Sequence, residues 1–135
     1  MKTRYVALAF IALSGVAAIV LADDAPPLTK DELQQMIPGS QVVSTGQRGF
    51  LRRWTNDPSG SFEASWETPA GVKRASGSAP GTWHISEDGK YCVHIEWPRL
   101  QSETWCAAVQ KTADGKFSPV SDGKSYLPPQ TAITK

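Results

Sequence analysis

The sequence predicts a mainly β protein: a small antiparallel barrel or sandwich of about 7–8 strands, with one short N-terminal helix and one disulfide. Three observations lead to this prediction. Short β-rich runs alternate with Gly, Pro, Asn and Asp turn signals through most of the chain. A capped amphipathic segment precedes those runs. Three of the five tryptophans and both cysteines gather between Gly81 and Cys106.

Residues 1–22 have the features of a cleaved signal peptide. Lys2 and Arg4 form a positive start, and an apolar run follows to Ala22, where small or aliphatic residues suit signal peptidase. A membrane anchor is the alternative, because the apolar run is just long enough to span a bilayer. We expect cleavage after Ala22, no membrane anchoring afterwards, and a bacterial protein that is periplasmic or secreted.

The remaining chain is short enough to form a single domain, which we place at 23–127, with a loose C-terminal tail at 128–135. The net charge of the remaining chain is close to zero. Without Lys2 and Arg4, 12 of the 14 basic residues remain, and 13 acidic residues balance them. Nucleic-acid binding usually needs a basic face or stripe, so we expect no nucleic-acid partner. The local cluster of Arg48, Arg52 and Arg53 is expected to be solvated at a strand edge.

The two cysteines, Cys92 and Cys106, are expected to form a structural disulfide because the chain carries an export signal. A redox couple and a metal site are the alternatives. Redox couples usually bring their cysteines together as C-x-x-C, and a structural zinc site wants four ligands at short spacings. The disulfide therefore remains the favoured interpretation.

A helix is predicted over residues 30–37. Thr29 and Glu32 form a capping box at its start, apolar residues follow at spacings of three and four, and Pro38-Gly39 ends the pattern. We expect this helix to pack across an open end or an edge of the sheet.

The rest of the domain is expected to be β. Residues 61–67 alternate cleanly, with apolar side chains on one face and polar side chains on the other. The Gly- and Ser-rich residues 77–81 predict a flexible connection. The expected strands are 49–55, 61–67, 72–76, the two runs that meet at Asp88-Gly89, 103–111, 116–120 and 124–127.

The Asp88-Gly89 turn predicts a register for the central hairpin. A two-residue type I′ turn there pairs Ile85 with Cys92 and Trp83 with His94. If Cys92 also faces Cys106, two faces follow. The face expected to be core carries Tyr91, Val93, Ile95, Trp97, Trp105, Ala107 and Val109. The mixed face carries Trp83, Ile85, the disulfide, His94, Glu96 and Thr104.

The same register argues against a metal centre and offers no catalytic residues. It places His84 and His94, the two histidines of the chain, on opposite faces, so we expect no metal site. Glu96 is expected to make at most a loose contact with His94. Residues 77–81 have the spacing of a nucleophile elbow but carry Ala79 where the serine belongs. An enzyme is thus poorly supported, and no cofactor is expected.

Several short motifs resemble those of a family of small exported proteobacterial proteins of unknown function. The motifs are residues 28–33, Ile37-Pro38-Gly39, Gly81-Thr82-Trp83, Tyr91-Cys92 and Trp105-Cys106. The resemblance covers most of the mature chain, although only the block from Gly81 to Cys106 is specific. It implies a periplasmic β-barrel-like domain and provides no known catalytic or binding residues.

The sequence therefore favours recognition over chemistry. The first hypothesis is a non-enzymatic binding module that holds a small apolar or aromatic ligand in the barrel mouth or on the mixed face. The alternative is a protein-interaction factor, such as an envelope inhibitor or accessory subunit, because Trp and Arg often anchor interfaces. The candidate contact residues are Trp83, His94, Trp97 and Arg99. Any of the tryptophans, however, can simply be core.

Overall fold

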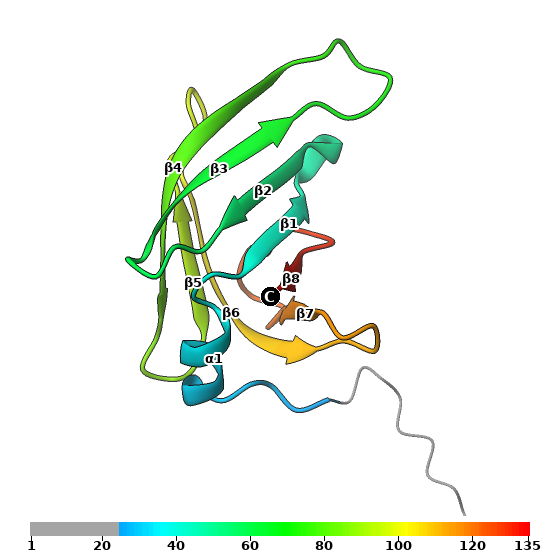
Figure 1. The fold of residues 1–135 in the computed structure, drawn as a ribbon. Coiled ribbons are helices and arrows are strands. Elements are labelled where there is room, and N and C mark those ends of the chain that lie inside the picture. The colour runs from blue at the N-terminus through cyan, green and yellow to red at the C-terminus, as the bar shows by residue number, and fades with distance from the viewer. Residues whose placement is uncertain (1–24) are drawn as a thin grey trace, which may run out of the picture.

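A computed structural model describes residues 25–135, and the predicted signal peptide at 1–22 lies outside that range. One short α-helix precedes eight β-strands (Figure 1). The elements are α1 (Lys30–Met36), β1 (Gln41–Thr45), a 3₁₀ turn η2 (Gln47–Gly49), β2 (Leu51–Thr55), β3 (Ser61–Glu67), β4 (Ser76–Ile85), β5 (Tyr91–Ile95), β6 (Glu103–Lys111), β7 (Phe117–Val120) and β8 (Ala132–Thr134).

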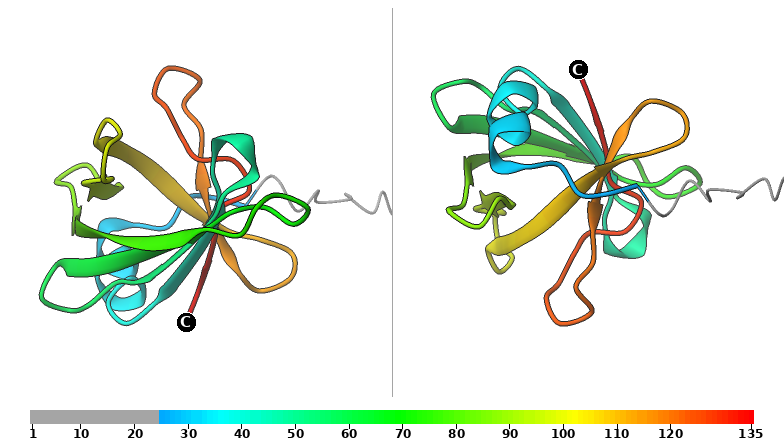
Figure 2. Two further views of the ribbon diagram at one scale, coloured as in Figure 1. Left: turned by 90° about the horizontal axis from the view of Figure 1, so that it is seen from above. Right: turned by 90° about the horizontal axis from the view of Figure 1, so that it is seen from below.

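The strands form a closed antiparallel barrel in which each strand pairs with the next and β8 returns to β1. This confirms the predicted fold class and decides between a barrel and a sandwich. The β1–β2, β3–β4, β5–β6 and β7–β8 connections lie at one end, because consecutive strands run in opposite directions. The other three connections lie at the opposite end, where α1 crosses the barrel (Figures 1 and 2).

α1 closes its end of the barrel. The predicted capping box is present: the Glu32 backbone N–H donates to the Thr29 hydroxyl, and the Glu32 carboxylate accepts from the Thr29 backbone N–H. Leu33 and Ile37 are fully buried in the core. The predicted helix and its place across an open end are therefore confirmed. Within residues 25–135, no helix has the length and apolar character needed to cross a membrane.

A chain of polar groups lies beneath α1. The Trp54 indole donates to the Tyr91 hydroxyl at 3.2 Å, and that hydroxyl donates to the Asn56 side-chain oxygen at 2.6 Å. The Asn56 amide then donates to the Ser40 hydroxyl, 3.1 Å away. Burial raises the pKa of Tyr91 well above its ordinary value, so the phenol stays protonated and keeps donating. Buried polar groups add stability when they are paired in this way.

The predicted register of the central hairpin is wrong by one residue. Its loop has three residues rather than two: the Ser86 N–H donates to the Lys90 carbonyl, and Gly89 has a φ of +76°. That geometry belongs to three-residue hairpin loops with glycine in the left-handed position. Trp83 consequently lies opposite Val93 instead of His94, which turns its side chain toward the barrel interior.

The pairing of β5 with β6 matches the prediction. Cys92 lies opposite Cys106 and is bonded to it, and Val93 lies opposite Trp105. The predicted core face is confirmed for six residues, which are buried, whereas Trp97 is half-buried. The six are Tyr91, Val93, Ile95, Trp105, Ala107 and Val109.

Two predictions around β4 are wrong. Residues 72–75 precede the strand, and the supposedly flexible residues 77–81 lie within it. The glycines there make room for rings on β3. A Cβ at Gly81 would lie 2.2 Å from the Phe62 ring, and one at Gly77 would lie 2.8 Å from the Trp66 ring nitrogen. Glycine in a strand can mark close packing as well as flexibility.

The C-terminal residues are not a loose tail. Within the predicted tail at 128–135, β8 pairs with β1 and closes the barrel, and its central residue, Ile133, is fully buried. Residues 124–127, predicted to be a strand, form a loop instead. Neither β8 nor β1 was predicted from the sequence, because each strand is short and contributes few apolar side chains to the core.

The closing role of β8 yields a stability prediction. Ile133→Ala should lower the free energy of unfolding by about 2–5 kcal/mol, because it removes buried methyl groups from a packed site. Thr134→Ala, one residue further along the same strand, should change it by less than about 0.5 kcal/mol. Urea denaturation measures both. A loose tail would instead give two equally small effects.

The disulfide yields a second prediction. Replacing Cys92 and Cys106 together with alanine should lower the free energy of unfolding by about 2–4 kcal/mol, because the unfolded chain loses a cross-link. Urea denaturation followed by circular dichroism measures the change, and the native spectrum should persist. Wild-type protein denatured with a reducing agent present should reproduce the loss. An unchanged stability in both samples would contradict the prediction.

Candidate functional site

The open end of the barrel holds a cavity of about 910 Å³, which we call the mouth pocket. It lies opposite the end that α1 closes, among the β1–β2, β5–β6 and β7–β8 connections. Its lining consists of Gly46, Phe50, Arg52, Trp66, Trp97, Pro98, Glu103, Thr104, Tyr126 and the β5–β6 loop residues Arg99, Leu100, Gln101 and Ser102.

Aromatic side chains make up much of its wall. Phe50, just before β2, packs edge-to-face against Trp66 at the end of β3, with ring centroids 5.8 Å apart. Trp66 lies over Gly77 of the neighbouring strand. Trp97 and Tyr126 contribute from the β5–β6 and β7–β8 loops. Such a surface offers flat apolar contacts to a small molecule.

A buried ion pair spans the barrel beside these rings. The Arg52 guanidinium on β2 donates through Nη1 to the Glu103 carboxylate on β6. The two strands are four places apart in the ring of eight, so the pair joins opposite walls. Only 7% of the Arg52 side chain and 9% of the Glu103 side chain are exposed. The Trp105 indole also donates to Glu103, at 3.0 Å.

The Arg52 side chain is held from several directions but is not fully paired. Its Nε donates to the Ser44 hydroxyl at 3.1 Å, and its guanidinium carbon lies 5.3 Å from the centre of the Trp97 ring. Its Nη2 atom is buried and has no hydrogen-bond acceptor among the described residues. A buried charged donor without an acceptor lowers the stability of the fold. A hydrogen-bond acceptor added at this position would therefore be stabilising.

Two loops at the rim add polar groups. Partial burial, followed by the nearby negative charge of Glu103, raises the pKa of Tyr126 above its ordinary value. The hydroxyl therefore stays protonated at neutral pH and can donate a hydrogen bond. Arg99 has a φ of +62°, in the left-handed region that few residues with side chains adopt, and the adjacent Leu100 is 75% exposed.

The structure separates the four predicted contact residues. Trp97 and Arg99 both line the mouth pocket. Trp83 packs against the core near the closed end, with its indole donating to the Asp57 carbonyl at 2.8 Å. His94 lies on the outer surface of the sheet, beside the disulfide. Only half of the predicted set therefore shares one site.

The outer surface around His94 differs from the prediction in two ways. Because of the one-residue change of register, His84 and His94 share the outer face instead of lying on opposite faces. Glu96 also bonds His94 directly: Nε2 lies 2.5 Å from the Glu96 carboxylate, and Nδ1 lies 2.6 Å from the Thr104 hydroxyl. Within residues 25–135, no three His, Cys, Asp or Glu side chains are placed to hold a metal ion.

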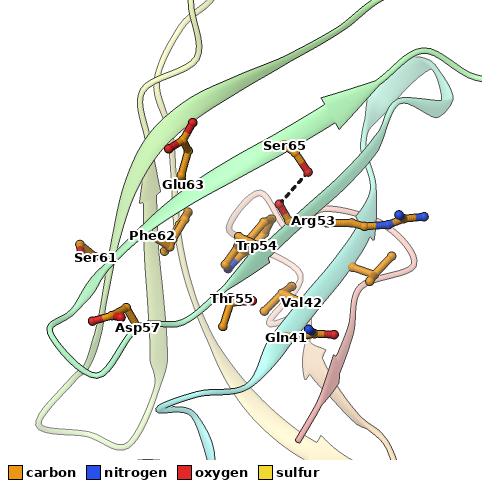
Figure 3. A pocket seen from close by; sticks show the side chains of 11 residues that line it. Gln41, Val42, Arg53, Trp54, Thr55, Asp57, Ser61, Phe62, Glu63 and Ser65 are labelled. Atoms are coloured by element: carbon orange, nitrogen blue, oxygen red, sulfur yellow. Dashed lines mark hydrogen bonds between the residues drawn. The ribbon is translucent and has the colours of Figure 1, made fainter.

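A second hollow, of about 700 Å³, lies on the outer wall between β2 and β3 (Figure 3). The pairing of these strands stops at Arg53 and Ser65. Beyond that point the stacked rings of Trp54 and Phe62, 5.2 Å apart, form the bottom of the hollow. Exposed polar side chains surround it, so it offers less apolar contact than the mouth pocket.

Several mouth residues were missed in the sequence analysis: Phe50, Arg52, Trp66, Glu103 and Tyr126. The prediction that Arg52 is solvated is wrong, because its residue surface is only 6% exposed. One signal was available. Arg52 lies two residues before Trp54 on a strand, so the two share a face, and Trp54 is an obvious core residue. Its partner, Glu103, carried the same signal, because it lies two residues before Trp105, a residue of the predicted core face.

Comparison with protein-family models, curated proteins and solved structures found no match to this chain.

The contrasting positions of two tryptophans yield a prediction. Trp83→Ala should lower the free energy of unfolding by about 2–4 kcal/mol, because the ring packs on Tyr91 and caps a backbone carbonyl. Trp97→Ala should cost clearly less, since its ring lies at the mouth. Urea denaturation of the two variants measures the difference. Equal losses would make Trp97 a core residue.

Proposed function

We propose that the protein is an exported, non-enzymatic binding module that holds a small apolar or aromatic ligand in the mouth pocket. One observation carries the proposal: an aromatic-walled cavity of about 910 Å³ at the open end of a barrel whose other end is closed. Ligand sites typically occupy about 300–1,000 Å³ and combine apolar walls with a few polar groups. Eight-stranded barrels are known to hold one small ligand in this way.

The arrangement of charge supports binding rather than catalysis. Glu103, the acidic residue of the lining, is held by Arg52 and Trp105. A carboxylate fixed in an ion pair is poorly placed to act as a general base. The charged groups of the pocket therefore serve better to orient a ligand than to move a proton.

The same surface gives less support to a protein partner. Trp66, Trp83 and Trp97 are half-buried and the other two tryptophans are buried, so they form no exposed aromatic patch. Leu100 and Tyr126 are the exposed large apolar residues of the mouth, and they lie on two different loops. Scattered exposed apolar side chains of this kind are normal on a protein surface.

Export is part of the proposal. The positive start, the apolar run and the small residue at Ala22 support cleavage of residues 1–22. The Cys92–Cys106 disulfide supports an oxidising compartment, because such bonds persist there and are rare in the cytosol. We accordingly place the protein in the periplasm or outside the cell.

The binding proposal is tested with a neutral fluorescent probe, N-phenyl-1-naphthylamine, whose emission rises in apolar sites. The wild-type protein should bind it saturably in a one-to-one ratio. Trp97→Ala should weaken binding by roughly tenfold, because it removes one aromatic wall and about 1.4 kcal/mol of contact. Fluorescence titration gives both dissociation constants.

A matched control comes from the second hollow. Val43 is exposed on the outer wall and lines that hollow, so Val43→Asp should leave probe binding unchanged. If Val43→Asp rather than Trp97→Ala abolishes binding, the ligand site lies on the wall and not in the mouth. Absence of saturable binding by the wild-type protein would remove the main support for the proposal.

A further inference from the structure

The mouth pocket contains more than an apolar wall, and its polar groups constrain the ligand. Three of its lining residues are charged: Arg52, Arg99 and Glu103. Two are positive and one is negative, so the lining has a net charge of about +1 at neutral pH. A ligand with one negative charge would bring the pocket to neutrality.

The donors that are still free point to the same chemistry. Arg52 uses Nη1 for Glu103 and Nε for Ser44, which leaves Nη2 without an acceptor among the described residues. Guanidinium groups bind carboxylates through charge-assisted hydrogen bonds that are stronger than neutral ones. Arg99 and the Tyr126 hydroxyl line the same cavity and can donate to the second oxygen of such a group.

We propose that the natural ligand is a small monocarboxylate with an apolar body, its carboxylate bound to Nη2 of Arg52 and its body packed against Phe50, Trp66 and Trp97. This inference rests on the proposed function and specifies the class of its ligand. Two positive groups against one negative group disfavour a cationic ligand. The aromatic walls offer few hydrogen bonds to replace the water of a strongly hydrated one.

The ion pair with Glu103 fits this role. A guanidinium that is buried alone would be costly, so Glu103 compensates the charge of Arg52 and holds its side chain in position while the pocket is empty. The carboxylate of the ligand then adds a bond to the remaining donor and does not have to displace Glu103. The cation–π contact with Trp97 holds the same guanidinium from the rim.

The test uses displacement of N-phenyl-1-naphthylamine by matched pairs of competitors: decanoate against decanol, and 4-phenylbutyrate against 4-phenylbutanol. The wild-type protein should bind at least one acid roughly tenfold or more tightly than its alcohol, because a charge-assisted bond is lost in the alcohol. Equal affinities within both pairs would overturn the carboxylate assignment. Probe binding itself reports separately on the proposed function.

Two variants locate the effect. The first combines Arg52→Met with Glu103→Met and so removes both charges. Removing both charges of a buried ion pair destabilises a protein less than removing one of them. This variant should bind the alcohols as the wild type does and lose the preference for acids. Arg52→Lys, which keeps the charge but lacks Nη2, provides the same test if the double variant fails to fold. It should reduce the preference roughly tenfold.

The control is Arg53→Met, which removes the neighbouring, outward-facing arginine of the same strand. It should keep the full preference for acids. A preference that survives in both Arg52 variants would overturn the proposal even if the probe still binds. A preference that disappears in Arg53→Met would overturn it as well, because the recognised charge would then lie on the outer wall.

Discussion

The Arg52–Glu103 ion pair connects opposite walls of the barrel and lies between its packed core and its open end. On one side of the pair lies a core of buried aliphatic and aromatic residues, closed by α1. On the other side lies the mouth pocket. Two opposite charges inside a small barrel are costly to remove from water, so each needs additional hydrogen bonds. Glu103 accepts one from the Trp105 indole, and the Arg52 Nε donates one to the Ser44 hydroxyl.

The buried polar groups at the two ends of the barrel differ in how completely they are hydrogen-bonded. At the closed end, Trp54, Tyr91, Asn56 and Ser40 form a continuous chain of hydrogen bonds, which suits a purely structural role. At the mouth, the corresponding network is incomplete at Nη2 of Arg52. Natural proteins satisfy nearly all buried polar groups, and the exceptions concentrate at functional positions. This contrast is the physical reason for proposing a ligand site at the mouth.

The sequence was informative where signals were local and less so where they depended on distant strands. The capping box at Thr29 and Glu32, the alternation of 61–67 and the Cys92–Cys106 pairing could all be predicted, because each depends on nearby residues or on a covalent link. The hairpin register was missed because Asp-Gly serves both two- and three-residue loops, and that single residue exchanged the faces of Trp83 and His84. β8 was missed because a strand of three residues carries almost no periodicity. The burial of Arg52 was missed although it shares a face with Trp54, because a buried charge needs a partner and no nearby residue reveals that Glu103, on the opposite wall, pairs with it.

The most direct test of a ligand site in the mouth is the indole N–H spectrum of the ¹⁵N-labelled protein, recorded during titration with 4-phenylbutyrate. The five tryptophans give one signal each and sample both ends of the barrel. Binding in the mouth pocket predicts shifts for Trp66 and Trp97, which line that pocket, and for Trp105, whose indole donates to Glu103. Trp54 and Trp83, bonded to Tyr91 and Asp57 respectively, should keep their positions. Shifts confined to Trp54 and Trp83, or no shift at saturating ligand, would contradict binding in the mouth pocket.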